Sequence, residues 1–322
     1  MATLANATAV PARRETDWSI AVAAVAMVAF LIAAPFLLYP VFVMKALCFA
    51  LFACAFNLLI GYVGLVSFGH ALYFGWASYF AAYSAKAWGL QPELAVLVGT
   101  AAAAALGLIA GRIAIRRQGI YFAMITLALA QMMYLVALRV KMTGGEDGIQ
   151  GVPRGRLFGM FDLNNEMTMY VFVLVVVLAA FFLIYRIINS PFGEVLKAIR
   201  ENEQRAISLG YKTDDYKLVA FVLSATLAGL AGSLKALVFQ LASLTDVHWT
   251  MSGEVVLMTL VGGLGTVFGP VVGAFLIVAM ENYLAPFGQW VLVIQGAVFV
   301  ICVLAFRRGI VGEIAARLRV RL

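Results

Sequence analysis

The sequence predicts an all-α polytopic membrane protein, and three observations support that class: the composition, the apolar runs and the placement of charge. The chain has 322 residues, of which 64% are hydrophobic and 12% are charged, and its mean hydropathy is +0.98. Such a chain cannot be solvated as a water-soluble globule, and helices satisfy their own backbone hydrogen bonds inside a bilayer. We therefore expect a bundle of about eight full spans and one glycine-broken, re-entrant segment.

Eight apolar runs are long enough to cross a hydrocarbon core of about 30 Å as helices. The first run continues into further spans without an evident small-residue cleavage site, which indicates a retained helix and not a signal peptide. The three cysteines lie inside apolar runs, so they predict neither disulfides nor a metal site. The runs are 18–38, 41–60, 62–83, 94–111, 120–138, 170–188, 216–238 and 289–306.

The positions of the charges predict the orientation of these spans. The net charge of +7 could suggest nucleic acid, but most lysines and arginines gather at the two chain ends and in two connections, 112–118 and 189–215. The positive-inside rule places all four regions in the cytoplasm and the charge-balanced connection 139–168 outside. The expected division is a cytoplasmic N-terminus 1–17, a transmembrane domain 18–306 that includes the cytoplasmic segment 189–215, and a basic cytoplasmic tail 307–322.

The same rule requires residues 251–281 to cross the membrane an even number of times, because a single crossing would deliver the tail to the outside. The stretch contains LVGGLGTVFGPVVGAF, whose glycines and Pro270 interrupt a helix, so we predict two short arms meeting at a bend. An earlier segment, GYVGLVSFG at 61–69, echoes GGLGTVFG at 262–269. Paired glycine-interrupted segments indicate a transport pathway built from internal repeats, although glycines also let helices pack closely without any substrate.

Polar side chains stranded in apolar spans extend this candidate pathway, since each needs either a solute or another helix as its partner. His70 could sense a carboxylate, but a helix-to-helix hydrogen bond is the more common role of a lone membrane histidine. The candidate translocation residues are Asn57, Gly61, Gly64, Ser67, Gly69, His70, Thr126, Gln131, Gly262, Gly263, Gly265 and Gly269.

Residues 189–215, which we call the polar segment, form a long hydrophilic connection between apolar spans. Ser190 is a suitable N-cap before Pro191, and Gly210 is a suitable stop, so we expect one helix of about 19 residues. Its length favours docking to a partner over a solvated connector, because most helix links are a few residues long. One face would carry Val195, Ile199, Asn202, Ala206 and Leu209, and Glu201 would precede Arg205 by four residues.

Within the polar segment, GEVLKAIRENEQRAISLGY resembles the coupling motif of permease subunits in bacterial branched-chain amino-acid ABC importers. The similarity extends over nearly the whole chain, through NLLIGYVGLVSFGHALYFGWASY, GIYFAMITLALAQ, TGGEDGIQGVP and LVGGLGTVFGPVVGA, and is strongest to the M-type subunit. The resemblance implies an internal-repeat ABC importer permease in which the polar segment couples to an ATPase. Glu201, Asn202, Glu203, Ala206 and Gly210 stand at the matching places of the motif. The expected coupling residues also include Gly193, Glu194, Val195, Ile199, Arg200 and Arg205.

The resemblance also implies the partners. They are an H-type permease subunit, two ABC ATPase subunits that hold ATP-Mg, and a periplasmic solute-binding protein, assembled in the bilayer of a bacterial inner membrane. The chain itself lacks a GxxxxGK[ST] loop and is expected to be neither an enzyme nor a cofactor-binding protein. The side that meets the binding protein would carry the turn cluster Thr143, Gly144, Gly145, Asp147 and Gly148.

The solute implied by the resemblance is leucine, isoleucine or valine, with urea, short amides or aromatic acids as the alternative for the same kind of permease. A stand-alone ion-coupled secondary transporter is a rival of another class, but it would need a buried acidic residue at mid-membrane, and none is clear in the sequence. A membrane-embedded enzyme is disfavoured because no paired carboxylates, HExxH or Ser-His-Asp arrangement is visible.

Overall fold

Helices account for nearly all regular structure in the computed structural model, which describes residues 18–288, 290–306 and 308–318. The predicted N-terminus 1–17 and tail residues 307 and 319–322 lie outside the described residues. The α-helices are α1 Trp18–Leu37, α2 Pro40–Tyr62, α3 His70–Ala87, α4 Pro92–Ala114, α5 Ile120–Arg139, α6 Glu166–Ile188, α7 Pro191–Glu201, α8 Glu203–Ser208, α9 Thr213–Phe239, α10 Trp249–Gly262, α11 Gly269–Leu284, α12 Trp290–Ala305 and α13 Gly309–Leu318.

Short elements fill some of the connections. Strand β1 pairs antiparallel with β4, which places Ile149 opposite Ala242, and β2 pairs antiparallel with β3. These elements are β1 Ile149–Gln150, β2 Arg156–Leu157, β3 Phe161–Asp162 and β4 Leu241–Ala242, with 3-10 turns η1 Lys141–Thr143, η2 Leu244–Asp246 and η3 Ala285–Phe287.

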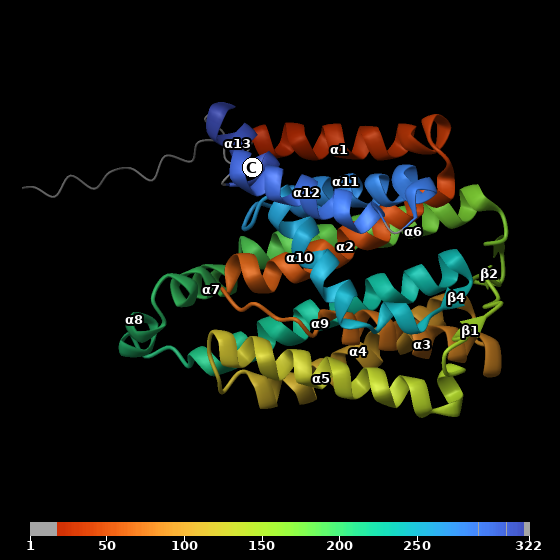
Figure 1. Cartoon of the computed structure of the whole chain (residues 1–322), viewed down its shortest axis with the longest axis horizontal. Coiled ribbons are helices and arrows are strands. Elements are labelled where there is room, and N and C mark those ends of the chain that lie inside the picture. Colours follow the sequence, from red (N-terminus) through yellow and green to blue (C-terminus); the bar gives the residue numbers. More distant parts are fainter. Residues whose placement is uncertain (1–17, 289, 307, 319–322) are drawn as a thin grey trace, which may run out of the picture.

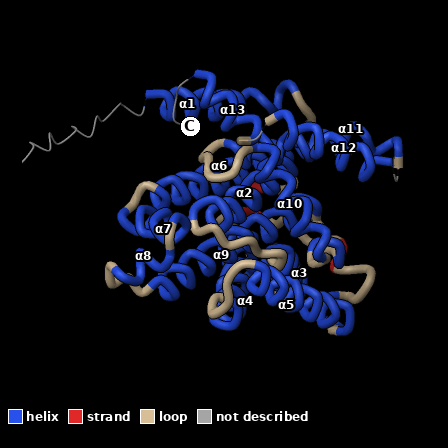
Figure 2. Tube along the Cα trace, turned by 60° about the vertical axis from the view of Figure 1, so that its left-hand side comes forward, coloured by secondary structure: helices blue, strands red, loops and turns tan. Residues whose placement is uncertain are grey.

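Helix α9 lies in the core of the bundle, packed against α2, α3 and α4 (Figure 1). Small residues permit these close contacts: a Cβ added to Gly107 of α4 would lie 2.6 Å from that of Ala225, and one added to Gly111 would lie 2.9 Å from the Phe221 ring. Figures 1 and 2 both show α1, α11 and α12 on one side of this core and α4 and α5 on the other.

Six helical stretches are long and apolar enough to cross a membrane: α2, α4, α5, α6, α9 and residues 269–287. The predicted runs 18–38 and 289–306 correspond to α1 and α12, which contain shorter apolar helices. The all-α polytopic class is confirmed, whereas the count of eight full spans and the re-entrant character of 251–281 remain predictions.

The predicted span 62–83 is wrong at its start. Helix α2 ends at Tyr62, residues 63–69 are not helical, and α3 begins only at His70. Gly64 has φ +82°, a left-handed conformation that stops the helix and that hydropathy does not detect. The equivalent segment later in the chain breaks in the same way, because α10 ends at Gly262 and α11 begins at Gly269.

The two ends of the bundle carry different elements. Helices α7, α8 and α13 lie at one end and the strands lie at the other (Figure 1). The connection between α4 and α5 belongs to the first end, since Gln118 donates a hydrogen bond to Glu203 of α8. The regions predicted to be cytoplasmic that the structure describes therefore share one end.

Candidate functional site

The polar segment forms two helices and not the single helix that the sequence predicts. Asn202 is extended at φ −160° and ψ 97°, which ends α7, and its side chain accepts a hydrogen bond from Arg205 N at 3.0 Å, which caps α8. Asparagine competes with the helix for backbone hydrogen bonds in this way. As a consequence Glu201 and Arg205 are not neighbours on one helix, and they form no ion pair in the part of the chain that the structure describes.

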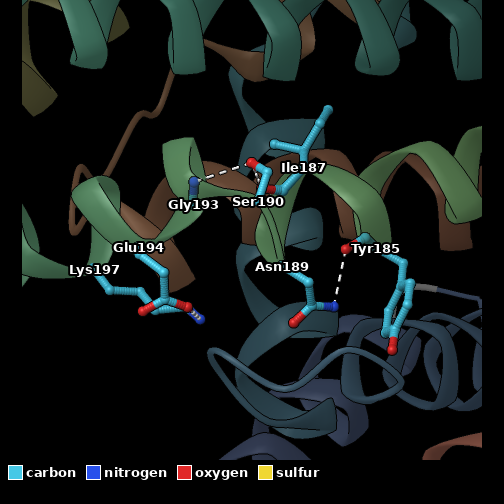
Figure 3. Close-up of polar contacts among 7 residues, drawn as sticks. All are labelled: Tyr185, Ile187, Asn189, Ser190, Gly193, Glu194 and Lys197. Atoms are coloured by element: carbon cyan, nitrogen blue, oxygen red, sulfur yellow. Dashed lines mark hydrogen bonds and ion pairs between the residues drawn. The ribbon is translucent and has the colours of Figure 1, made fainter.

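The start of α7 agrees with the prediction. Ser190 Oγ accepts a hydrogen bond from Gly193 N at 3.3 Å and donates one to Ile187 O at 2.7 Å, and Pro191 occupies the first helical turn (Figure 3). Further along α7, Lys197 pairs with Glu194 at 2.8 Å. A side chain on Gly193 would overlap the carbonyl groups that end α6, so the turn between α6 and α7 requires glycine there.

Burial divides the predicted coupling residues into two groups. Gly193, Ile199 and Ala206 are buried within the chain, and Val195 and Glu203 are half-buried. Ile199, one of the expected coupling residues, is only 3% exposed and packs inside the protein, so it is not available to a partner. The exposed members are Glu194, Arg200, Glu201, Asn202, Arg205 and Gly210.

Three exposed apolar side chains lie after the break, at the far tip of the polar segment. Ile207, Leu209 and Tyr211 are 48%, 70% and 41% exposed. We call these three residues the apolar tip. Figure 1 shows α8 projecting farthest from the bundle at this end.

Glu203 fastens α8 to the bundle. Its Oε1 accepts hydrogen bonds from Lys217 Nζ at 2.7 Å and Thr213 Oγ1 at 3.1 Å, and its Oε2 accepts one from Gln118 at 2.9 Å. Lys217 is 2% exposed and pairs also with Asp214 at 3.0 Å. The half-buried carboxylate thus joins α8 to α9 and to the connection between α4 and α5.

The two glycine-rich loops, 61–69 and 262–269, meet at this end of the bundle. Asn57 of α2 links them, because its Nδ2 donates to Thr266 O at 2.9 Å while its Oδ1 accepts from Gly265 N at 3.0 Å. A Cβ added to Gly61 would lie 2.9 Å from Gly265 N, so the two backbones approach as closely as glycine allows.

The remaining predicted glycines serve close packing or special backbone conformations. Gly263 has φ +128° and Gly265 has φ +74°. A side chain on Gly262 would overlap the carbonyl of Gly269, and one on Gly69 would lie 2.6 Å from Thr126 O. These contacts give the glycines a packing role, and their role in a pathway stays a prediction.

His70 makes a hydrogen bond between helices. Its Nε2 lies 2.8 Å from Ser224 Oγ of α9, and Ser224 Oγ donates to Ala55 O of α2 at 2.5 Å. The imidazole is fully buried, with the rings of Phe56 and Tyr73 edge-on beside it. His70 thus joins α3 to α9 and, through Ser224, to α2.

The other predicted polar residues of the pathway lie around the 63–69 loop. Thr126 accepts a hydrogen bond from Phe68 N at 3.2 Å and donates to Ala123 O at 2.9 Å. Ser67, fully buried, accepts one from Gly69 N at 3.3 Å. Gln131, further along α5, is half-buried. Nothing in these contacts identifies a solute site.

The turn cluster predicted to face the binding protein is a compact turn at the opposite end. Thr143 is buried, and its hydroxyl lies 2.5 Å from Ala137 O and 2.6 Å from Val140 O. Gly144, Gly145 and Gly148 all have positive φ, between +63° and +77°. Asp147 is exposed, and its carbonyl accepts from Gln150 Nε2 at 3.3 Å.

Sequence reasoning missed two ion pairs. Lys235 of α9 lies 2.6 Å from Asp246, with side chains 10% and 3% exposed, and Lys45 of α2 lies 3.0 Å from Glu281. Asp246 is a buried acidic residue that the sequence did not single out, but it lies in the turn η2 between α9 and α10, and its charge is matched by Lys235. The sequence did carry a signal for these pairs, because Lys45 and Lys235 lie inside apolar runs and a charged side chain there needs a partner. Metal-ligating groups of three or more residues are absent from the described part of the chain.

The fold and the site define a class of protein: a multi-pass α-helical permease with a hydrophilic segment projecting from one end. The sequence pattern of the family described as "Branched-chain amino acid transport system / permease component" matches residues 38–303. The chain belongs to this family, and it is a membrane transport permease and not an enzyme.

Individual relatives agree with the family. The high-affinity branched-chain amino acid transport system permease protein LivM of Escherichia coli (strain K12) is 25% identical over 288 residues, which cover 82% of this chain and 68% of that protein. The probable branched-chain amino acid transport permease protein LivH of Methanocaldococcus jannaschii is 27% identical over 158 residues, 46% and 47% of the two chains.

A third relative is the autoinducer 2 import system permease protein LsrC of Photorhabdus laumondii, 30% identical over 99 residues, which cover 29% of this chain and 30% of that protein. No solved structure matches the chain. The family match and the relatives together support a LivM-like branched-chain amino acid permease.

Proposed function

We propose that the chain is one permease subunit of an ATP-driven importer, forming half of a pathway for leucine, isoleucine and valine. It pairs with an H-type permease, two ATPase subunits and a periplasmic binding protein in a bacterial inner membrane. The end that carries α7, α8 and α13 faces the cytoplasm, so both termini are cytoplasmic. ATP and Mg²⁺ bind only to the ATPase subunits.

The observation that carries the proposal is the construction of the polar segment. Its base is fixed, through the capped start at Ser190 and the part-buried hydrogen bond from Lys217 to Glu203, while the apolar tip is exposed beyond the bundle. A rigid arm with exposed apolar side chains and a charged rim is suited to insertion into a cleft of a partner. A solvated connector would need neither the hydrogen bonds that fix Ser190 and Glu203 nor the exposed apolar side chains of the tip.

The outer surfaces of the bundle leave room for lipid and for a second permease. In the apolar stretches of α5 and α6 only 28% of the residues are buried within this chain, whereas 89% are buried in α2. Helices that are apolar on all sides and so little buried are suited to contact with acyl chains or with another transmembrane subunit.

Co-purification with the ATPase subunits tests the proposal. We expect Leu209→Arg, and the double reversal Glu201→Lys with Arg205→Glu, to release the ATPases from the detergent-solubilised complex. A matched reversal at exposed charges of the opposite end, Arg156→Glu with Glu166→Lys, should retain them. Retention of the ATPases and of transport by both polar-segment variants would refute coupling through this arm.

The solute requires a separate measurement, because binding proteins choose the solute in importers of this kind. Calorimetry on the cognate binding protein should show heat of binding for leucine, isoleucine or valine. Binding of urea, short amides or aromatic acids in their place would refute the branched-chain assignment and leave the coupling proposal intact.

A further inference from the structure

Arg200 is an exposed residue overall, but its guanidinium reaches from α7 to the first glycine-rich loop. Its Nη1 donates a hydrogen bond to the main-chain carbonyl of Gly61, 139 residues earlier in the chain. The stem of the side chain passes beside Gly64, where an added Cβ would lie 3.2 Å from Arg200 Cγ. The arginine therefore contacts the first glycine-rich loop at both glycines of its GxxG sequence.

The second glycine-rich loop lies within reach of the same guanidinium. A Cβ added to Gly265 would lie 3.3 Å from Arg200 Nη1, and Gly265 is tied to Asn57, one helical turn before Gly61. The head of Arg200 thus sits where the loop between α2 and α3 meets the loop between α10 and α11. A planar guanidinium binds a carbonyl in a fixed direction. This contact therefore holds the Gly61 carbonyl in a defined position relative to α7 and does not merely attract it.

The other attachments of the polar segment lead elsewhere. Ser190 joins α7 to the end of α6, and Glu203 joins α8 to Lys217 and to the connection between α4 and α5. Among the hydrogen bonds of the described residues, the bond from Arg200 to the Gly61 carbonyl is the one that connects the polar segment to the glycine-rich loops.

We propose that Arg200 is a positioning residue that makes both glycine-rich loops follow the polar segment when that segment moves. The inference deepens the proposed function and rests on it for its consequence in transport, but the mechanical link exists in the chain by itself. Arg200 acts inside this subunit, which differs from the partner-facing role that the sequence resemblance suggests.

A distance measurement tests the link without any partner. In a cysteine-free background, spin labels at Ala198 of α7 and Leu264 of the second loop, both exposed, report the separation of the two elements by pulsed electron resonance. We expect Arg200→Met to broaden the distance distribution. Arg186→Met removes another exposed arginine of the same end and should leave the distribution unchanged.

Identical distributions for the wild-type protein and Arg200→Met would overturn the proposal. If Arg200→Met is not monodisperse, Arg200→Lys provides the same test, because it keeps the charge without the planar head. We expect an intermediate broadening for the lysine variant, and a distribution identical to wild type would overturn the proposal in the same way.

The assembled transporter in lipid vesicles tests the consequence, with radiolabelled leucine as the probe. We expect Arg200→Met to retain the ATPase subunits and ATP hydrolysis while the amount of leucine moved per ATP falls about ten-fold, the size of effect that loss of one charge-assisted hydrogen bond produces. An unchanged ratio would overturn the inference. ATPase subunits that do not bind even the wild-type chain would refute the proposed function, and the spin-label experiment would still decide the link.

Discussion

Replacing Lys235 by methionine should strongly destabilise the protein, because it leaves Asp246 charged and buried. The two side chains are 10% and 3% exposed and 2.6 Å apart, and Asp246 also accepts a hydrogen bond from Ser243 N at 3.1 Å. Methionine keeps most of the aliphatic stem and removes the ammonium group, whose Nζ also lies over the Phe239 ring. Breaking one side of a buried ion pair costs about 3–5 kcal/mol, and we expect that loss for Lys235→Met.

The assay is unfolding in mixed micelles at increasing SDS, followed by tryptophan fluorescence. The double variant Lys235→Met with Asp246→Asn should lose less stability than the sum of the single variants, since no uncompensated charge remains. The pair Lys45 and Glu281 is the control, because its side chains are 30% and 21% exposed and Lys45→Met should cost no more than about 1 kcal/mol. Additive losses in the double variant would refute a buried ion pair.

Three further substitutions test the packing of the site by the same unfolding assay. Asn57→Leu leaves Gly265 N and Thr266 O of the second glycine-rich loop unpaired and should lower the free energy of unfolding by about 1–3 kcal/mol for each group. A smaller loss of stability would contradict the two hydrogen bonds. Gly232→Ala should destabilise by about 1–3 kcal/mol, because the new methyl overlaps the Phe74 carbonyl, so wild-type stability would exclude that close approach. Lys217→Met should cost about 1.5–3 kcal/mol and increase hydrogen exchange in α8, and unchanged exchange would show that the Glu203 carboxylate does not hold this helix.

The sequence predicted the helices well where one local signal dominated. Runs 94–111 and 170–188 fall inside α4 and α6, since length and hydropathy decide which segments become buried helices. Ser190 caps α7 as its hydroxyl and the following proline predict. The helix break between Gly262 and Gly269 was also predictable, because glycine and proline disfavour a continuous helix there.

The errors occurred where local preferences were close in energy and distant contacts decided between them. Residues 190–210 have enough helical propensity for one helix, but Asn202 caps a second one whose carboxylate at Glu203 is held by Lys217. An apolar residue on one helix face, such as Ile199, can either anchor a partner or pack in the core, and the sequence pattern is the same in both cases. Packing of α7 on the bundle placed Ile199 in the core.

The amino-acid sequence by itself determined the membrane class, most of the helices and the family, because hydropathy, helix caps and motifs are properties of neighbouring residues. Only the tertiary structure decided that Lys235 meets Asp246, that His70 bonds to Ser224, and that Arg200 reaches the Gly61 carbonyl. Contacts between residues so far apart in the chain depend on how the helices pack, and packing is set by the shapes of many side chains together.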